Sequence, residues 1–413
     1  MFDFAALPPA IRSRLVWSGV ALMALALPTP SHAAPAYSVS GRCAGFPKVA
    51  LSSLAGTCVG LVGSGLGFPR GLAEHGGDIY ITDLGSRSPG RGRLLRVRLD
   101  RPWKPIVVLS HLDRPGAIVS GADGSLYIAE SGRIIQFNPD AADPATSIKP
   151  VLTGLPTDGL HNLPGLAIGR DGSLFVSIGS ASDNCEDANG DRPRPDRPCP
   201  ELTASPPRGS ILRLPANRPG HVATNAAEVY ALGIRNALAL LPLPRGALLA
   251  ASNGRDNIDA VDPRLSDQQL PHDLLLSVVD GSRHGWPYCF DLNRPSPEYP
   301  RTKCGAFARP VLLLPPHAAP LAMIAYRGTL PLGAGQRLLL AFHGYRSSGH
   351  RIVSLATTKK GMPTGSPVDL VWGWQAVRNV RPQGAPVALL GLGDGSVLIL
   401  EDHNGTLLRL AAR

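Results

Sequence analysis

Helical periodicity is nearly absent from this sequence beyond its N-terminal stretch, which argues against a helical bundle and for an architecture of short strands. Charged residues are also few, at 17% of 413 residues, whereas hydrophobic residues make up 44%, so the chain can bury a substantial core. No CxxC spacing occurs, which disfavours a zinc site. No basic helix or patch of interleaved basic and aromatic residues is present, so we expect no nucleic-acid partner.

Glycine and proline are plentiful instead, at 46 and 41 residues, and they are spread along the chain, as many tight turns require. The formal net charge is +10 and is carried mainly by arginine. A solvated, arginine-biased surface accounts for this charge. A surface that meets an acidic partner or holds an anionic cofactor is the alternative.

The N-terminal stretch predicts an export signal. Arg12 and Arg14 precede an apolar run from Leu15 to Leu27, and residues 28–33 end in a small-x-small pattern. These features predict a signal peptide over 1–33, cleaved after Ala33, and therefore a periplasmic or secreted protein. An uncleaved membrane anchor is the alternative, although the run is short for a membrane span. No later segment resembles a transmembrane span.

Six cysteines fit an exported chain, because an even number in an oxidising compartment favours disulfides. The sequence alone leaves their connectivity open, but local pairing would close one short loop with each bond. The predicted pairs are Cys43–Cys58, Cys185–Cys199 and Cys289–Cys304.

A strand–turn–strand unit recurs along the chain. Leu166–Ile168 and Leu174–Ile178 are predicted strands, and Asp171-Gly172 between them is typical of a tight hairpin turn. The copies span Asp123–Ile128, Asp394–Ile399 and, in degenerate form, Gly77–Ile81.

Six such units account for most of the chain. Their predicted beginnings, after an N-terminal strand and loop over 41–66, are Gly67, Arg114, His161, Val229, Pro320 and Gly384. Four strands with turns need about 40–60 residues, so six blades fit this length. A sandwich or a closed barrel would not explain the repeat. The predicted fold is therefore all-β, a six-bladed β-propeller over 41–413.

Side chains that could bind a ligand or act as a base recur at one phase of the repeat, in the loops before the inner strands. In a propeller these loops converge near the axis. Arginine binds carboxylates and stacks on flat rings, so this ring of residues suits a planar polyanion, and a histidine beside arginines stays neutral and can act as a base. Taken singly, each residue is better explained as structural, but the shared phase favours a site. The residues are Arg70, His161, Arg235, Asn236, His317, Arg378 and Arg381.

Several stretches also resemble a known family, the soluble quinoprotein glucose/sorbosone dehydrogenases. These are six-bladed propellers that bind pyrroloquinoline quinone (PQQ) and calcium. Two of the stretches, Pro316–Pro320 and His343-Gly344, are more similar to the sorbosone-dehydrogenase branch. The others are His161–Gly179, Gly233–Asn236 with the downstream Asn253–Asp256, and Gly285–Pro287.

The resemblance implies roles for individual residues. His161 matches the general base that removes the C1 hydroxyl proton of the sugar while hydride passes to the quinone. Gly254 and Arg255 fall where two consecutive backbone carbonyls hold the calcium ion. The implied cofactor-binding residues are Arg70, Arg235, Asn236, Trp286, His317, His343, Arg378 and Arg381.

The chain departs from the family pattern at several positions. Leu160 stands where the glucose dehydrogenases have an aspartate that orients the base, so His161 is expected to lack that partner. No lysine stands where that branch contacts a PQQ carboxylate, and His317 is the expected substitute. Asn162–Pro164 differs from the polar residues that follow the histidine in the sorbosone branch, and His343–Arg346 matches that branch only in part.

One polar segment, Asp183–Asp191, is rich in oxygen ligands and contains a glycine turn, as a calcium loop requires. It lacks the EF-hand spacing and the distal bidentate glutamate. A calcium loop and a solvated, disulfide-closed loop are therefore both open.

Together these features predict an exported PQQ- and calcium-dependent dehydrogenase that oxidises an aldose at C1 or a related sugar aldehyde. Its electrons would pass to a periplasmic acceptor such as a cytochrome or a quinone. A calcium-dependent propeller lactonase is one alternative, but it needs carboxylate ligands on the axis, and these are scarce before the blades. A non-catalytic propeller that binds glycans or protein is the other, and Leu160 keeps it open.

Overall fold

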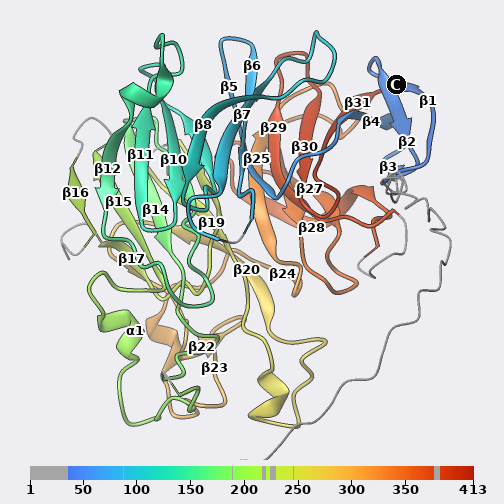
Figure 1. Cartoon of the computed structure of the whole chain (residues 1–413). Coiled ribbons are helices and arrows are strands. Elements are labelled where there is room, and N and C mark those ends of the chain that lie inside the picture. The colour runs from blue at the N-terminus through green and yellow to red at the C-terminus, as the bar shows by residue number, and fades with distance from the viewer. Residues whose placement is uncertain are drawn as a thin grey trace, which may run out of the picture. The chain divides into compact units, whose positions relative to one another are not determined.

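Six blades, each with four antiparallel strands, make up the computed structural model, and four of them are extended by additional edge strands (Figure 1). The innermost strands of the blades contact one another in a closed ring. The structure describes residues 36–413 except 87, 188, 216–219, 224–228, 245 and 376–381. The predicted signal peptide, 1–33, lies outside the described residues. The prediction of a six-bladed β-propeller is confirmed.

The first three blades follow the chain in order. Blade one consists of β5 (Pro69–His75), β6 (Asp78–Asp83), β7 (Gly92–Val97) and β8 (Ile106–Leu112). Blade two consists of β9 (Ile118–Ser120), β10 (Leu126–Glu130), β11 (Arg133–Phe137) and β12 (Lys149–Thr153), with β16 (His221–Val222) at its edge. Blade three consists of β13 (Leu166–Ile168), β14 (Ser173–Ile178), β15 (Ser210–Pro215) and β17 (Val229–Leu232), with β21 (Ser282–Arg283) at its edge.

The last three blades continue the same order. Blade four consists of β18 (Ala239–Pro242), β19 (Leu248–Ser252), β20 (His272–Val278) and β24 (Leu312–Pro316). Blade five consists of β25 (Pro320–Tyr326), β26 (Arg337–Phe342), β27 (Arg351–Thr357) and β28 (Pro363–Trp372), with β3 (Ser52–Ser53) at its edge. Blade six consists of β29 (Pro386–Gly391), β30 (Val397–Glu401), β31 (Thr406–Ala412) and β4 (Thr57–Gly63), followed by β2 (Phe46–Val49) and β1 (Val39–Cys43).

Two predicted unit boundaries are wrong. Val229–Leu232 does not begin blade four but pairs with β15 as the outer strand of blade three, so Gly233–Asn236 is the crossing to the next blade. The predicted N-terminal strand and loop over 41–66 contains β4, which pairs with β31 and completes blade six. This closure joins the two ends of the propeller through a strand pair whose partners are far apart in sequence.

The aspartate–glycine turns are confirmed as hairpins. In the copy at Asp171, the carboxylate accepts a hydrogen bond from the Ser173 backbone N–H at 3.1 Å, and Gly172 has φ +77°, a conformation that glycine adopts without strain. Arg213 on the third strand pairs with the same carboxylate at 2.5 Å. Arg409 pairs with Asp394 in the same way, which explains why arginine recurs in the strand that follows these turns.

Buried apolar side chains fill the space between neighbouring blades. One such cluster joins strands of blades two and three, including Ile134, Leu174 and Leu212. Another joins blades five and six, including Leu339 and Ile399. The core is thus divided among the blade interfaces, as a propeller requires.

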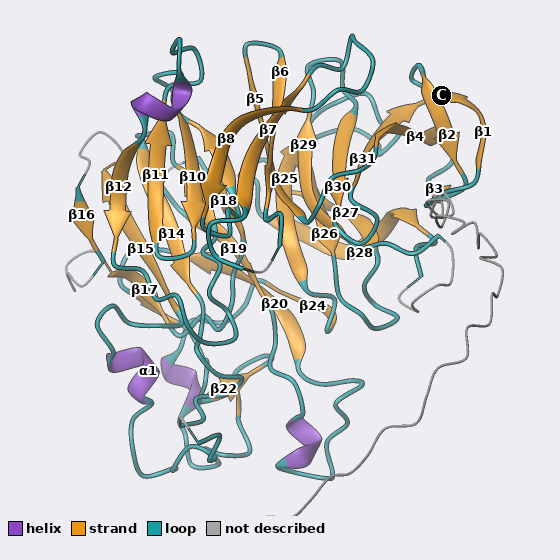
Figure 2. Ribbon diagram, viewed as in Figure 1, coloured by secondary structure: helices purple, strands orange, loops and turns teal. Residues whose placement is uncertain are grey.

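Little of the chain is helical (Figure 2). The described residues contain one α-helix, α1 (Pro200–Thr203), and three short 3-10 turns, at Pro144–Ser147, Ile258–Ala260 and Cys304–Ala306. Among these residues no helix has the length and apolar character to cross a membrane.

The three predicted disulfides are confirmed, with Cα–Cα distances of 5.8, 6.0 and 6.0 Å. Cys185–Cys199 closes the long insertion of blade three. Cys289–Cys304 closes the segment that carries the small hairpin of β22 (Cys289–Phe290) and β23 (Arg294–Pro295). These two segments pack together through Cys185, Cys199 and Trp286, at one end of the propeller (Figure 1).

Candidate active site

One face of the propeller collects the predicted site residues. His161 lies in the loop before β13, Arg235 and Asn236 lie between β17 and β18, and His317 lies between β24 and β25. These loops have the same phase in successive blades, so the fold brings them to the same end. Gly254 and Arg255 follow the second strand of blade four and reach the same end.

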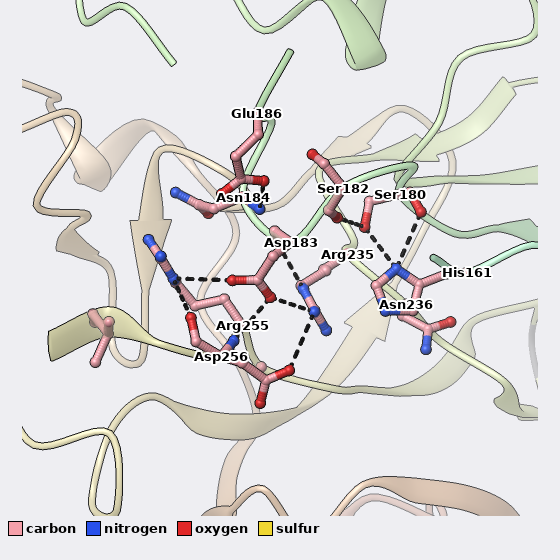
Figure 3. Close-up of polar contacts among 12 residues, drawn as sticks. His161, Ser180, Ser182, Asp183, Asn184, Glu186, Arg235, Asn236, Arg255 and Asp256 are labelled. Carbon is pink, nitrogen blue, oxygen red and sulfur yellow. Dashed lines mark hydrogen bonds and ion pairs between the residues drawn. The ribbon is translucent and has the colours of Figure 1, made fainter. Parts of the chain in front are cut away.

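The His161 ring is held by a residue that the sequence analysis missed. Its Nδ1 lies 3.1 Å from the Ser180 carbonyl oxygen and 2.9 Å from the Ser180 hydroxyl oxygen (Figure 3). The Ser180 hydroxyl donates its own proton to the Ser182 carbonyl at 2.7 Å, so both Ser180 oxygens accept from the ring. Nδ1 therefore carries the proton, and Nε2 carries the free lone pair.

Leu160 supplies no orienting carboxylate to His161, as expected, but Ser180 orients the ring in its place. Leu160 is 66% exposed and takes no part in holding the ring. Ser180 lies two residues after the end of β14, and the hairpin between β13 and β14 returns it to the loop that carries His161. The partner comes from the end of the next strand instead of from the preceding residue.

The electrostatic surroundings keep His161 neutral. Burial, followed by the positive charge of Arg235, lowers the pKa of His161 to about 3. The imidazole is therefore unprotonated at neutral pH and can accept a proton at Nε2.

Asp183 lies between two guanidinium groups (Figure 3). Arg235 donates to its backbone carbonyl at 2.9 Å and to its carboxylate at 2.5 Å, and Arg255 approaches the other carboxylate oxygen at 3.6 Å. The carboxylate also accepts from the backbone N–H of Asp256 at 2.8 Å. Asp183 therefore satisfies both the charge and two hydrogen bonds of the Arg235 guanidinium. These contacts, with the Cys185–Cys199 disulfide, favour the disulfide-closed loop over a calcium loop at Asp183–Asp191.

The turn after β19 presents oxygen atoms toward the same region. Asp273 fixes this turn, since its carboxylate accepts from the backbone N–H groups of Gly254 at 2.7 Å and Ala319 at 2.6 Å. The side-chain oxygen Oδ1 of Asn253 is buried and has no hydrogen-bond partner within the described part of the chain. This orphaned oxygen, next to the backbone of Gly254 and Arg255, suits a hard cation such as calcium.

Two other predicted residues complete this group. Trp286 donates from its indole N–H to the Asp183 carbonyl at 3.3 Å and lines a small cavity with Arg235 and Arg255. His317 lies 3.2 Å from the Asp256 carboxylate. Burial alone would lower the pKa of His317, but the hydrogen bond with Asp256 raises it overall. This hydrogen bond favours the protonated, cationic form of His317.

Arg70 and His343 lie elsewhere on this face, around Asp402. Arg70 pairs with the Asp402 carboxylate at 3.0 Å, and the His343 Nε2 lies 3.1 Å from it. Arg378 and Arg381 fall among 376–381, outside the described residues. The structure thus brings His161, Arg235, Asn236, Gly254, Arg255, Trp286 and His317 into one group, and Arg70 and His343 into a second.

The basic site residues also contact carboxylates for which the sequence analysis predicted no such contact. Asp183 pairs with Arg235, and Asp256 pairs with His317. Asp267 pairs with Arg346 and lies 3.7 Å from the His317 Nε2. Asp183 was visible as part of a polar insertion, but only the fold places this insertion over Arg235. Asp256 adjoins the predicted calcium-binding turn, so its proximity to the site could have been inferred.

No protein-family model matches the chain, and no curated protein matches it. Solved structures, by contrast, do match the chain. An enzyme of carbohydrate-active enzyme family AA12 from Trichoderma reesei aligns over 91% of this chain and 100% of its own, with TM-score 0.71 and 18% identity. The PQQ domain of a pyranose dehydrogenase from Coprinopsis cinerea aligns over 89% and 99%, with TM-score 0.68 and 19% identity.

The soluble aldose sugar dehydrogenase of Escherichia coli is a third similar structure, with TM-score 0.60 and 16% identity over 86% of this chain and 100% of that one. At such identities these likenesses confirm the fold alone. The closer similarity to the sorbosone branch stays a prediction.

Proposed function

We propose that the chain is an exported PQQ- and calcium-dependent dehydrogenase that oxidises an aldose at C1 or a related sugar aldehyde. The observation that carries the proposal is the neutral His161, whose Nδ1 is fixed by Ser180 so that Nε2 carries the lone pair, with Arg235 beside it. This base lies on a fold that a PQQ-binding pyranose dehydrogenase domain and an aldose sugar dehydrogenase share.

The residues present fit both groups that this function requires. Arg235 and Arg255 suit the carboxylates of PQQ, and so does His317, whose protonated form is favoured by Asp256. The buried Asn253 oxygen and the neighbouring backbone of Gly254 and Arg255 suit calcium. A calcium structure has been solved of the Trichoderma reesei AA12 enzyme. PQQ, when bound, would supply the acceptor for two electrons.

The protein's own residues would accept the substrate hydroxyl proton and keep the accepting imidazole neutral beforehand. His161 would take the substrate hydroxyl proton at Nε2, while Nδ1 keeps its own proton and donates it to the Ser180 oxygens. Burial and the positive charge of Arg235 both disfavour protonation of the His161 ring, so the neutral base remains available over a wide pH range. Asp183 would leave Arg235 as a ligand carboxylate takes its place.

The alternatives gain less support from the site. Asp183 and Asp256 are both engaged by basic side chains, so these carboxylates are not free ligands for a lactonase metal. The non-catalytic alternative rested on an unsupported His161, and Ser180 supplies that support.

Titration of the purified apo-protein with PQQ, with and without calcium, tests the proposal. We expect saturable absorbance changes that require calcium, and dye reduction with one or more members of a panel of aldoses and sugar aldehydes. An EDTA-treated sample is the control. PQQ binding without turnover of any substrate in the panel would favour a non-catalytic propeller, and no binding would overturn the proposal.

A further inference from the structure

A cluster of imidazoles surrounds Asp402 on blades five and six. His343 directly follows β26, His350 directly precedes β27, and Asp402 and His403 directly follow β30. The His343 Nε2 lies 3.1 and 3.2 Å from the two Asp402 carboxylate oxygens. One ligand atom each from His343, Asp402 and His403 lies within 4.8 Å of the other two. The ring centroids of His350 and His403 are 6.3 Å apart.

His350 points independently to a ligand. Its Nδ1 lies 2.5 Å from the Gly384 carbonyl oxygen, which can only accept, so Nδ1 carries the proton and Nε2 the lone pair. This Nε2 is buried, in a residue only 5% exposed, and no described residue offers it a hydrogen bond. A backbone carbonyl on one ring nitrogen is the usual way in which metal-binding histidines are oriented.

We propose that His343, Asp402 and His403, with His350 as a fourth donor, bind a divalent metal ion of the zinc and copper class. Imidazole nitrogens with one carboxylate suit these ions, whereas calcium takes oxygen ligands. This site is therefore distinct from the calcium position at Gly254 and Arg255. All six cysteines are in disulfides, so no thiolate competes for the ion.

The cluster is accessible from solvent, and one neighbouring cation opposes metal binding. His403 is exposed, with the ring of Tyr345 stacked on it, so an ion can enter from solvent. Arg70 opposes binding, because its guanidinium shares the Asp402 carboxylate at 3.0 Å and repels a cation.

The inference does not depend on the proposed dehydrogenase function, and its test uses tag-free, EDTA-treated apo-protein without PQQ. Calorimetry with Zn²⁺ should give one site per chain, and Co²⁺ should give visible absorption that excess Ca²⁺ does not remove. His403→Ala and His350→Ala should each weaken Zn²⁺ binding by more than the roughly 10–100-fold that loss of an outer partner costs. Arg70→Gln should strengthen Zn²⁺ binding, because it removes the cation that pairs with Asp402.

His75→Ala is the matched control, because His75 pairs with one carboxylate, Asp140, at 2.8 Å on the hairpin between β5 and β6, outside this cluster. It should leave Zn²⁺ affinity unchanged. Absence of a Zn²⁺ site, or a site whose affinity is the same in His403→Ala and His350→Ala as in the unaltered protein, would overturn the proposal. So would equal weakening by His75→Ala.

Discussion

Ser180 accepts from the Nδ1 of His161 through two oxygens, its carbonyl at 3.1 Å and its hydroxyl at 2.9 Å. Ser180 is fully buried, and its hydroxyl proton is committed to Ser182. The pair therefore fixes both the orientation and the tautomer of the ring without placing a negative charge beside it. A carboxylate in this position would stabilise the imidazolium and raise the pKa of the base.

We expect Ser180→Ala to lower kcat modestly, because the Ser180 carbonyl still holds Nδ1. Loss of one neutral hydrogen bond costs about 0.5–1.5 kcal/mol, or roughly two- to tenfold in rate. Ser180→Asp should shift the acid limb of the pH–rate profile to higher pH, since the new carboxylate favours protonated His161. Steady-state kinetics across pH measure both effects, with Ser173→Ala, in a hairpin turn, as the control. Unchanged profiles in both Ser180 variants would show that Ser180 does not position the base.

His161→Gln should retain PQQ affinity but lose sugar-dependent dye reduction. Cofactor binding is assigned to the arginines and to calcium, whereas the proton acceptor is the His161 Nε2. Removal of a general base typically lowers the rate by about 10²–10⁴-fold. Equilibrium titration with PQQ and dye-reduction assays separate the two effects, and His75→Gln is the control. Wild-type turnover in the His161→Gln variant would exclude His161 as the base.

The repeat made the fold predictable, because each Asp-Gly turn with its flanking apolar strands defines one hairpin of a blade. The same signal misplaced the start of blade four, since Val229–Leu232 has the apolar character of both an inner and an outer strand. The role of β4 could not be inferred either. Closure depends on pairing Leu407 with Gly63, and no local pattern in the sequence reports such a distant partner.

The candidate site was predictable only where the repeat phase determines position. His161 and Arg235 precede inner strands, so their convergence followed from the fold. Ser180 escaped notice because a serine after a strand has no distinctive pattern, and its role arises from two oxygens meeting one ring nitrogen. Asp183 lies in an insertion without repeat phase, so its position between Arg235 and Arg255 depends on tertiary packing alone.

Arg235→Ala should weaken PQQ binding strongly. The guanidinium is buried, so removal of a charge-assisted contact costs about 1.5–3 kcal/mol, or roughly ten- to a hundredfold in affinity. Equilibrium titration measures this effect, with the exposed Arg264→Ala as the control, because Arg264 pairs only with the nearby Asp262 in the contacts described. Wild-type affinity in Arg235→Ala would mean that PQQ binds elsewhere.

Asp183→Asn should change PQQ affinity in the opposite direction. The Asp183 carboxylate competes for the guanidinium that the cofactor would use, and the amide keeps its shape but loses its charge. We therefore expect tighter PQQ binding, by up to about tenfold for one exchanged hydrogen bond. Double substitution with Arg235→Ala should abolish the gain. Weaker binding in Asp183→Asn would instead show that Asp183 orders Arg235 for the ligand.

His284 should make stability fall as the pH falls. The residue is 2% exposed, its Nδ1 has no hydrogen-bond partner in the described ranges, and burial lowers its pKa to about 4. The unfolded chain binds a proton at this residue below about pH 6.5, whereas the folded protein does not until about pH 4. The stability that neutral His284 contributes is therefore complete above pH 6.5 and is lost progressively between 6.5 and 4.

The size of this effect follows from the two pKa values. At pH 5 the folded protein should have lost about 2 kcal/mol through His284, at about 1.36 kcal/mol per pH unit. His284→Gln removes this contribution while leaving every other titrating group in place. Chemical denaturation of both proteins at pH 7 and pH 5 should therefore show the free-energy gap between them narrowing by about that amount. Parallel losses of stability in the two proteins would mean that His284 does not resist protonation in the folded state.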